Sequence, residues 1–170
     1  YDLRELPPGG DYLAARQPIL GNADVQMRWA AIDNPAPYLF RNADANELLF
    51  IHAGAGRLET DFGPLAYRPG DYLLIPRGTV HRLAPSSPTR ALVIEAASAI
   101  GFPDRGMLGQ HALFDPAVIK VPSPDEASTL TAGQATCAPD EWRVVIQRQG
   151  ALTSVYYRHC PLDTVGWKGT

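Results

Sequence analysis

Three residues in the first half of the chain have the types from which proteins build an iron site: Glu47, His52 and His81. Iron in oxygen-using enzymes is bound by two neutral imidazoles and one carboxylate, which leaves open positions for oxygen and substrate. The spacing fits this chemistry poorly, because His52 follows Glu47 by five residues and a flat strand would direct their side chains to opposite faces. We therefore expect structural roles for Glu47 and His81, and a metal site built from all three residues is the alternative.

Other candidate residues lie in the second half of the chain. His111 could contact a substrate across a subunit contact, and Arg105 could pair with a substrate carboxylate. Ordinary hydrogen bonding within a loop is the simpler interpretation for both. His159 and Cys160 could form a thiolate pair or a metal clip, but adjacent residues on a strand point to opposite faces, so we expect packing roles.

The tryptophans and cysteines are expected to be structural. Trp29, Trp142 and Trp167 are interpreted as core or interface anchors rather than as a cage around a substrate. Two isolated cysteines in a chain of this size, Cys137 and Cys160, are typical of reduced thiols rather than of a disulfide.

The elements that must position Glu47 and His81 are short strands separated by glycine and proline turns. Residues 47–52 form a continuous apolar run, which is expected of a strand between a barrel interior and a covering layer. Further strands are predicted at 57–62, 72–75 and 80–83, with turns at Pro69-Gly70-Asp71 and Pro76-Arg77-Gly78 between them. In the strand at 57–62 the alternation predicts one buried face and one wet face; the buried face holds Leu58, Thr60 and Phe62, and the wet face holds Arg57, Glu59 and Asp61.

The rest of the chain divides into an arm, a barrel and later segments. Residues 1–24 are expected to form an N-terminal arm, irregular to Ile19, and residues 25–100 the barrel core. Within that core, strands are predicted at 24–32, 38–41 and 90–97. The first should direct its apolar row toward the barrel interior; that row is Val25, Met27, Trp29 and Ala31. Residues 101–141 are expected to be a long loop and connector, and residues 142–170 a hairpin and a junction.

Composition agrees with one all-β domain. The chain has 170 residues, of which 45% are hydrophobic and 19% charged, so it can bury a core; its 16 prolines and 15 glycines suit short strands and tight turns. A formal net charge of −3 without a basic run argues against nucleic-acid or anionic-membrane partners. No apolar run approaches the roughly 20 residues that span a bilayer, and a cytoplasmic location is the default expectation.

The central stretch resembles the two motifs of the cupin family, which are antiparallel jelly-roll barrels. The matching residues are Glu47, Gly54, Gly56, Pro69, Gly70, Asp71, Pro76, Gly78 and His81. Metal-binding cupins carry a His-x-His pair a few residues before the glutamate, whereas residues 39–46 of this chain, LFRNADAN, contain no histidine.

Several stretches together resemble homogentisate 1,2-dioxygenases: LGNADVQMRW, the core from YLFRNADANELLF to PRGTVHRL, GQHALFDP and YYRHCPLDTVGWKGT. The last resembles that family's Y-x-x-x-P-F-D-V-V-G-W-x-G junction, with Leu162 in place of the phenylalanine. The resemblance implies the N-terminal barrel of a two-cupin iron(II) enzyme that converts homogentisate, a small aromatic acid, to maleylacetoacetate in tyrosine and phenylalanine breakdown. It also implies trimers or hexamers.

In that family the iron ligands, two histidines and a glutamate, lie in the C-terminal barrel, which would begin after Thr170. The resemblance therefore assigns no catalytic, cofactor-binding or metal-binding residue to this segment, which should bind no Fe(II) and be inactive by itself. Two alternatives stay open: a metal-free cupin that binds a ligand or acts as a scaffold, and a single-barrel metal enzyme that uses Glu47, His52 and His81.

Overall fold

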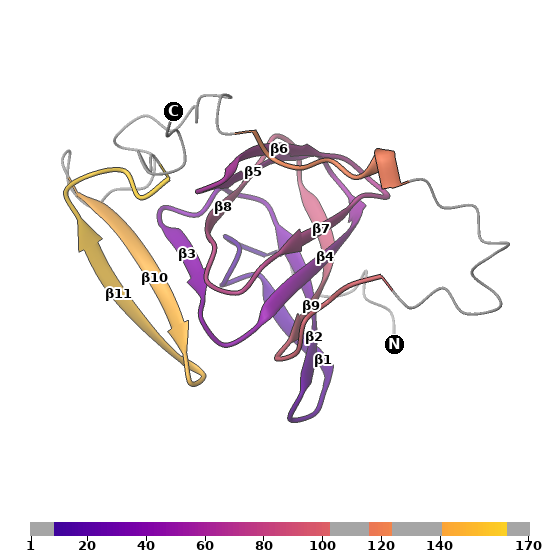
Figure 1. Ribbon diagram of the computed structural model, residues 1–170, viewed down its shortest axis with the longest axis horizontal. Helices are drawn as coiled ribbons and strands as arrows, with labels where there is room; N and C mark the ends of the chain where they lie inside the picture. The colour runs from indigo at the N-terminus through magenta and orange to yellow at the C-terminus, as the bar shows by residue number, and fades with distance from the viewer. Residues whose placement is uncertain (1–8, 103–115, 124–140, 163–170) are drawn as a thin grey trace, which may run out of the picture.

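The computed structural model describes residues 9–102, 116–123 and 141–162, which are almost entirely strands and turns (Figure 1). The strands are β1 (Arg16–Gly21), β2 (Val25–Ile32), β3 (Leu39–Asn42), β4 (Asn46–Ala53), β5 (Gly56–Thr60), β6 (Gly63–Tyr67), β7 (Tyr72–Ile75), β8 (Val80–Pro85), β9 (Thr89–Ala96), β10 (Trp142–Arg148) and β11 (Ala151–Tyr157). A short 3₁₀ turn, η2 (Pro116–Val118), follows β9.

The strands form two sheets that enclose a common core. The five-stranded sheet has the order β1-β2-β9-β4-β7, and the six-stranded sheet has the order β11-β10-β3-β8-β5-β6. Each pairing is antiparallel except that of β3 with β10, which is parallel. This is the all-β, cupin-type jelly roll that the sequence predicts, with one parallel pairing that it does not.

Strand alternation explains the core. On β4 the odd-numbered residues Glu47, Leu49 and Ile51 face the interior, and register aligns them with inward residues of β9 such as Val93. The two predicted proline–glycine turns flank β7, and Gly70 and Gly78 both have φ near +91°, which glycine adopts without strain.

The segment before β2 differs from the predicted irregular arm. Residues Asp11 to Ala15 form a turn in which the Asp11 carboxylate accepts the N–H groups of Leu13 and Ala14. Tyr12 is only 1% exposed and belongs to the core, and β1 pairs with β2 along the edge of the five-stranded sheet. The expectation of an arm outside the core is therefore wrong for Tyr12 and Arg16, whose side chains are buried in the barrel interior, whereas residues 17–21 form an exposed edge strand.

The faces of two strands also differ from the prediction. In β2 the core residues are Ala30 and Ile32, so the row that contains Trp29 lies on the outer face. In β5, Glu59 is 4% exposed rather than in water, because it lies beside Arg82 of the neighbouring strand β8, with Nε of Arg82 3.2 Å from Oε2 of Glu59. Strand β6, Gly63–Tyr67, is not predicted from the sequence.

The predicted hairpin at the end of the described chain is confirmed. Strands β10 and β11 are joined by Gln149 and Gly150, whose φ values are 52° and 74°, as a two-residue hairpin turn requires. Its strand β10 extends the barrel's own six-stranded sheet, where Trp142, Val144 and Leu162 form a second apolar cluster with Leu39. Arg105, His111, Cys137 and Trp167 lie outside the described residues.

Among the residues that the structure describes, none of the helical segments is long and apolar enough to span a bilayer.

Candidate functional site

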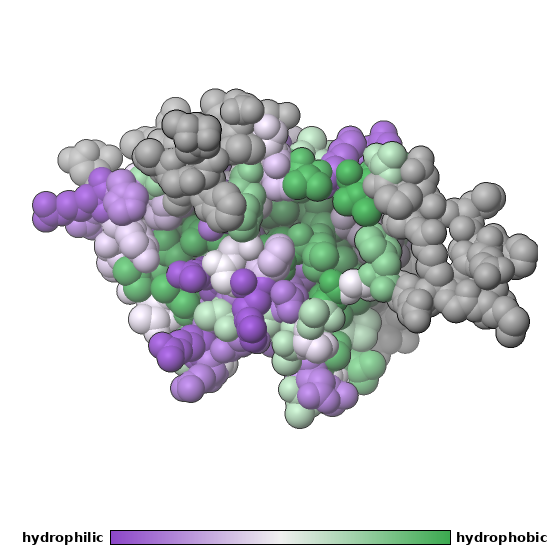
Figure 2. All heavy atoms as spheres, in the orientation of Figure 1, coloured by the Kyte–Doolittle hydropathy of each residue, from purple (hydrophilic) through white to green (hydrophobic). Residues whose placement is uncertain are grey.

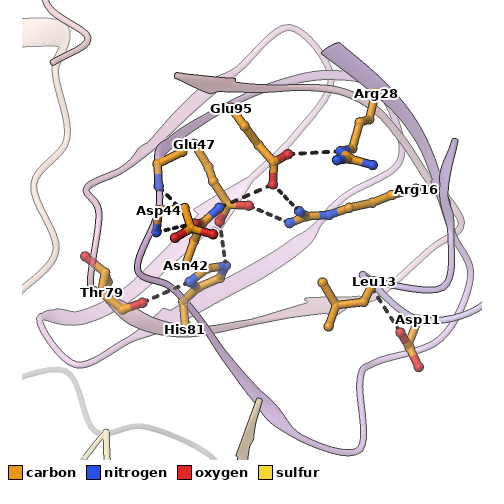
Figure 3. A network of polar contacts seen from close by, with 11 residues as sticks. Asp11, Leu13, Arg16, Arg28, Asn42, Asp44, Glu47, Thr79, His81 and Glu95 are labelled. Carbon is orange, nitrogen blue, oxygen red and sulfur yellow. Dashed lines mark hydrogen bonds and ion pairs between the residues drawn. The ribbon is translucent and has the colours of Figure 1, made fainter. Parts of the chain in front are cut away.

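Glu47 and His81, the two motif residues with metal-binding chemistry, meet inside the barrel (Figure 3). Glu47 lies near the start of β4 in one sheet and His81 on β8 in the other, and both side chains are fully buried. Nε2 of His81 is 3.4 Å from Oε2 of Glu47, and Nδ1 is 3.3 Å from the carbonyl oxygen of Thr79. The two motif residues therefore contact each other across the two sheets.

The cation at this meeting point is the guanidinium of Arg16. Arg16 donates from Nη2 to Oε1 of Glu47 at 2.6 Å and from Nη1 to Oε1 of Glu95 at 2.8 Å. Its side chain is 5% exposed, and its guanidinium carbon lies 3.9 Å from the ring centroid of Tyr12 and 5.2 Å from that of Phe40. Two carboxylates and two aromatic rings thus hold one guanidinium in a fixed place.

Glu95 of β9 extends this network to the barrel wall. Its Oε2 accepts from Nε of Arg28 at 2.9 Å, and its Oε1 accepts from Nδ2 of Asn42 at 3.2 Å as well as from Arg16. Asn42 is held in turn, because its Oδ1 accepts the N–H groups of Asp44 and Ala45 in the turn before β4. Figure 3 shows these side chains converging from separate strands.

The protonation states balance the buried charge. Burial lowers the pKa of His81, a shift that the attraction of Glu47 opposes, so the imidazole is neutral at pH 7. Burial alone would raise the pKa of Glu47, but the charge of Arg16, the electrostatic interaction with His81 and hydrogen bonds from Arg16 and Asn42 outweigh it and lower that pKa. The network pairs two acidic side chains, Glu47 and Glu95, with two guanidinium groups, Arg16 and Arg28, so acidic and basic side chains are matched in number.

These residues do not fit an iron ion. A metal at Glu47 would compete with Arg16 for the same carboxylate, and within residues 9–102, 116–123 and 141–162 no group of three His, Cys, Asp or Glu side chains is arranged to hold a metal. His52 lies on the outer face of β4, exposed, with its ring 5.9 Å from that of Trp29. The structure therefore brings Glu47 and His81 together and leaves His52 on the other side of the sheet.

The other predicted residues that the structure describes have packing contacts. Trp29 is largely buried on the outer face of β2, and Trp142 packs in the second apolar cluster. Cys160 packs against that cluster, and the ring of His159 lies 5.6 Å from that of Tyr157.

Sequence reasoning missed the residues that complete the network: Arg16, Arg28, Asn42 and Glu95. One signal was available, because Glu95 is a single carboxylate inside the apolar run of residues 90–97. A charge in such a run is buried and needs a counter-charge. No comparable pattern marks Arg16, which comes from a segment without strand periodicity.

Comparison with known proteins identifies the family. A family model described as "Homogentisate 1,2-dioxygenase N-terminal" matches residues 20–170. The chain is 33% identical over 132 residues to homogentisate 1,2-dioxygenase of Nitrobacter hamburgensis, in a match that covers 76% of this chain and 28% of the relative. It is 26% identical over 141 residues to the Caenorhabditis elegans enzyme, covering 82% of this chain and 30% of the relative.

A solved cupin protein from Bacteroides fragilis is similar in fold, with a TM-score of 0.45, 20% identity, and coverage of 52% of this chain and 82% of that chain. The chain spans less than a third of the curated relatives named above. The match over residues 20–170 shows that the chain belongs to the homogentisate 1,2-dioxygenase family, where it corresponds to the N-terminal domain.

Proposed function

We propose that this chain is the N-terminal barrel of an iron(II) dioxygenase that opens the ring of homogentisate to give maleylacetoacetate, in tyrosine and phenylalanine breakdown. Family membership supports the reaction class, and the relatives' much greater length supports a further barrel that holds the iron. In this proposal residues 1–170 supply scaffold, packing against the other barrel and contacts within a trimer or hexamer.

The position of Arg16 is the observation that most supports a structural role for this barrel and iron binding in the other. Its guanidinium donates to Oε1 of Glu47 and Oε1 of Glu95, and within the part of the chain that the structure describes no group of three His, Cys, Asp or Glu side chains is placed to hold a metal. We therefore assign these buried polar groups a structural role. His81 stays neutral, with Nδ1 placed to donate to the Thr79 carbonyl. The reacting atoms of substrate and oxygen are therefore expected to meet outside these residues.

Oxygen uptake with homogentisate by the complete polypeptide tests the reaction. We expect uptake together with bound iron, and no iron above background in residues 1–170 by themselves. Leu152→Ala should leave both unchanged, because Leu152 is 57% exposed on β11, in the six-stranded sheet. Stoichiometric iron in residues 1–170, lost in Glu47→Gln, would instead assign the metal to this barrel.

The second candidate is a metal-free cupin that acts as a binding or scaffold module, which the same buried network also suits. The coding sequence after Thr170 separates the two. A further barrel with a histidine, a glutamate a few residues later and another histidine supports the dioxygenase, whereas a stop codon directly after Thr170 supports the metal-free module.

A further inference from the structure

The outer face of the five-stranded sheet carries two rows of apolar residues. Register places five apolar residues in one row that crosses all five strands: Leu20 beside Met27, Met27 beside Ile94, Ile94 beside Leu48, and Leu48 beside Leu74. None of the five belongs to the main core cluster, because the core is built from the alternate residues of β2, β4, β7 and β9.

A second apolar row runs parallel to the first. Trp29 pairs with Leu92, Leu92 with Phe50, and Phe50 with Tyr72, and the rings of Phe50 and Tyr72 have centroids 4.9 Å apart. The two rows contain no charged residue. Figure 2 shows hydrophobic residues gathered around the positions that β4 and β7 occupy in Figure 1.

The middle residues of both rows are half-buried, Trp29 is buried, and the first row ends on exposed side chains at both edges of the sheet. Leu20 on β1 is 66% exposed, and Leu74 and Tyr72 on β7 are 47% and 67% exposed. A sheet that is apolar on both faces is usually a layer between two others, and a contiguous exposed apolar surface usually marks an interaction site. This face, which we call the outer apolar face and define by its two rows, has the composition of a buried layer.

We propose that a second β-barrel of the same polypeptide docks on the outer apolar face. This inference rests on the proposed function and adds the surface through which the two barrels meet. Chain length favours an occupant in the same polypeptide, because the match covers 28% of the Nitrobacter relative and most of that relative lies outside the matched region. A tethered domain has an effective concentration on the order of millimolar, which favours it over a second copy.

Photo-crosslinking in the complete polypeptide tests the proposal. A benzophenone amino acid replaces Leu74 in one variant and Leu20 in a second, so that one substitution that disturbs folding does not decide the outcome. The matched control carries it at Leu152, which is 57% exposed on β11, in the other sheet. After irradiation, denaturing electrophoresis separates adducts within one chain from adducts between chains, and mass spectrometry maps the peptides.

We expect adducts of monomer mass at positions 74 and 20 that map to residues after Thr170, at least tenfold more abundant than such adducts at position 152. Adducts of dimer mass would assign the face to a second copy, adducts mapped to residues 103–140 would assign it to this barrel's own chain, and absence of adducts would leave the face uncovered; each of these overturns the proposal. Oxygen uptake measured on the same variants reports on the proposed function separately, so the two can fail independently.

Discussion

Removing the positive charge of Arg16 is expected to destabilise the barrel by about 3–5 kcal/mol, because Glu47 and Glu95 would lose their shared buried partner. Arg16→Met keeps much of the side-chain volume, so the change in stability reports mainly on loss of the guanidinium. The matched control is Arg90→Met. The ion pair of Arg90 with Asp33 has the 2.8 Å separation of the Arg16–Glu95 pair, but its side chains are 32% and 25% exposed, so it should contribute ~1 kcal/mol or less. Urea unfolding measures both, and equal losses would contradict a special role for Arg16.

The lowered pKa values of His81 and Glu47 predict that acid destabilises the barrel. Below roughly pH 6.5 the unfolded chain protonates the imidazole of His81, whereas burial keeps it neutral in the native state. The unfolded state then binds more protons, so the free energy of unfolding falls as the pH falls. The lowered pKa of Glu47 adds a further loss below roughly pH 4.5.

His81→Gln should therefore flatten the pH dependence of stability just below roughly pH 6.5 and leave the loss at lower pH. His52→Gln is the control, because that imidazole is exposed on the outer face. Urea unfolding between pH 8 and 4 measures the slopes, and an unchanged slope in His81→Gln would contradict the assignment.

At the scale of single residues, the sequence predicts two of the six residues of the polar network. The spacing of the glutamate and histidine motifs places Glu47 and His81 correctly, and the five-residue step correctly separates His52 from Glu47. The partner charges were missed because Arg16 reaches the interior from an edge strand that has no apolar periodicity of its own. Local pattern therefore locates motif residues but not a counter-charge supplied by a distant segment.

At the scale of elements, two glycines with nearly the same backbone predict different costs. Gly54 and Gly70 have φ of +87° and +91°, so alanine is strained at both by ~1 kcal/mol. A Cβ at Gly54 would lie 2.4 Å from the Pro88 carbonyl oxygen, whereas one at Gly70 meets nothing within 4 Å. Gly54→Ala should lower the free energy of unfolding several times more than Gly70→Ala in urea unfolding. Similar losses would show that the contact with Pro88 relaxes.

Most strands could be predicted from turns and apolar runs, but the inward face of β2 could not. Its alternation is real, yet both faces of the five-stranded sheet are apolar, so Ala30 and Ile32 face the core while Met27 and Trp29 face outward. Ala30 is fully buried in the core cluster although its side chain is small. Alternation alone does not distinguish a core face from a docking face when a strand is covered on both sides.

At the scale of the whole molecule, the outer apolar face predicts self-association of residues 1–170 when they are produced without further chain. Leu74→Lys places a charge in the middle of an edge strand and should weaken that association at least severalfold. Leu152→Lys, a similarly exposed leucine on β11, should have a smaller effect. Sedimentation velocity over a concentration series measures both, and equal effects would show that general surface charge, rather than this face, controls association.

The parallel pairing of β3 with β10 has a consequence for synthesis on the ribosome. Leu39 of β3 pairs with Val144 of β10, which is synthesised roughly 100 residues later. Before β10 is made, β3 can pair only with β8, through Phe40 and Arg41. At a translation rate of about 5–20 residues per second, β3 has an unpaired edge for several seconds. Nascent chains halted before Trp142 should therefore be the forms that chaperones bind, and emergence of β10 should end that dependence.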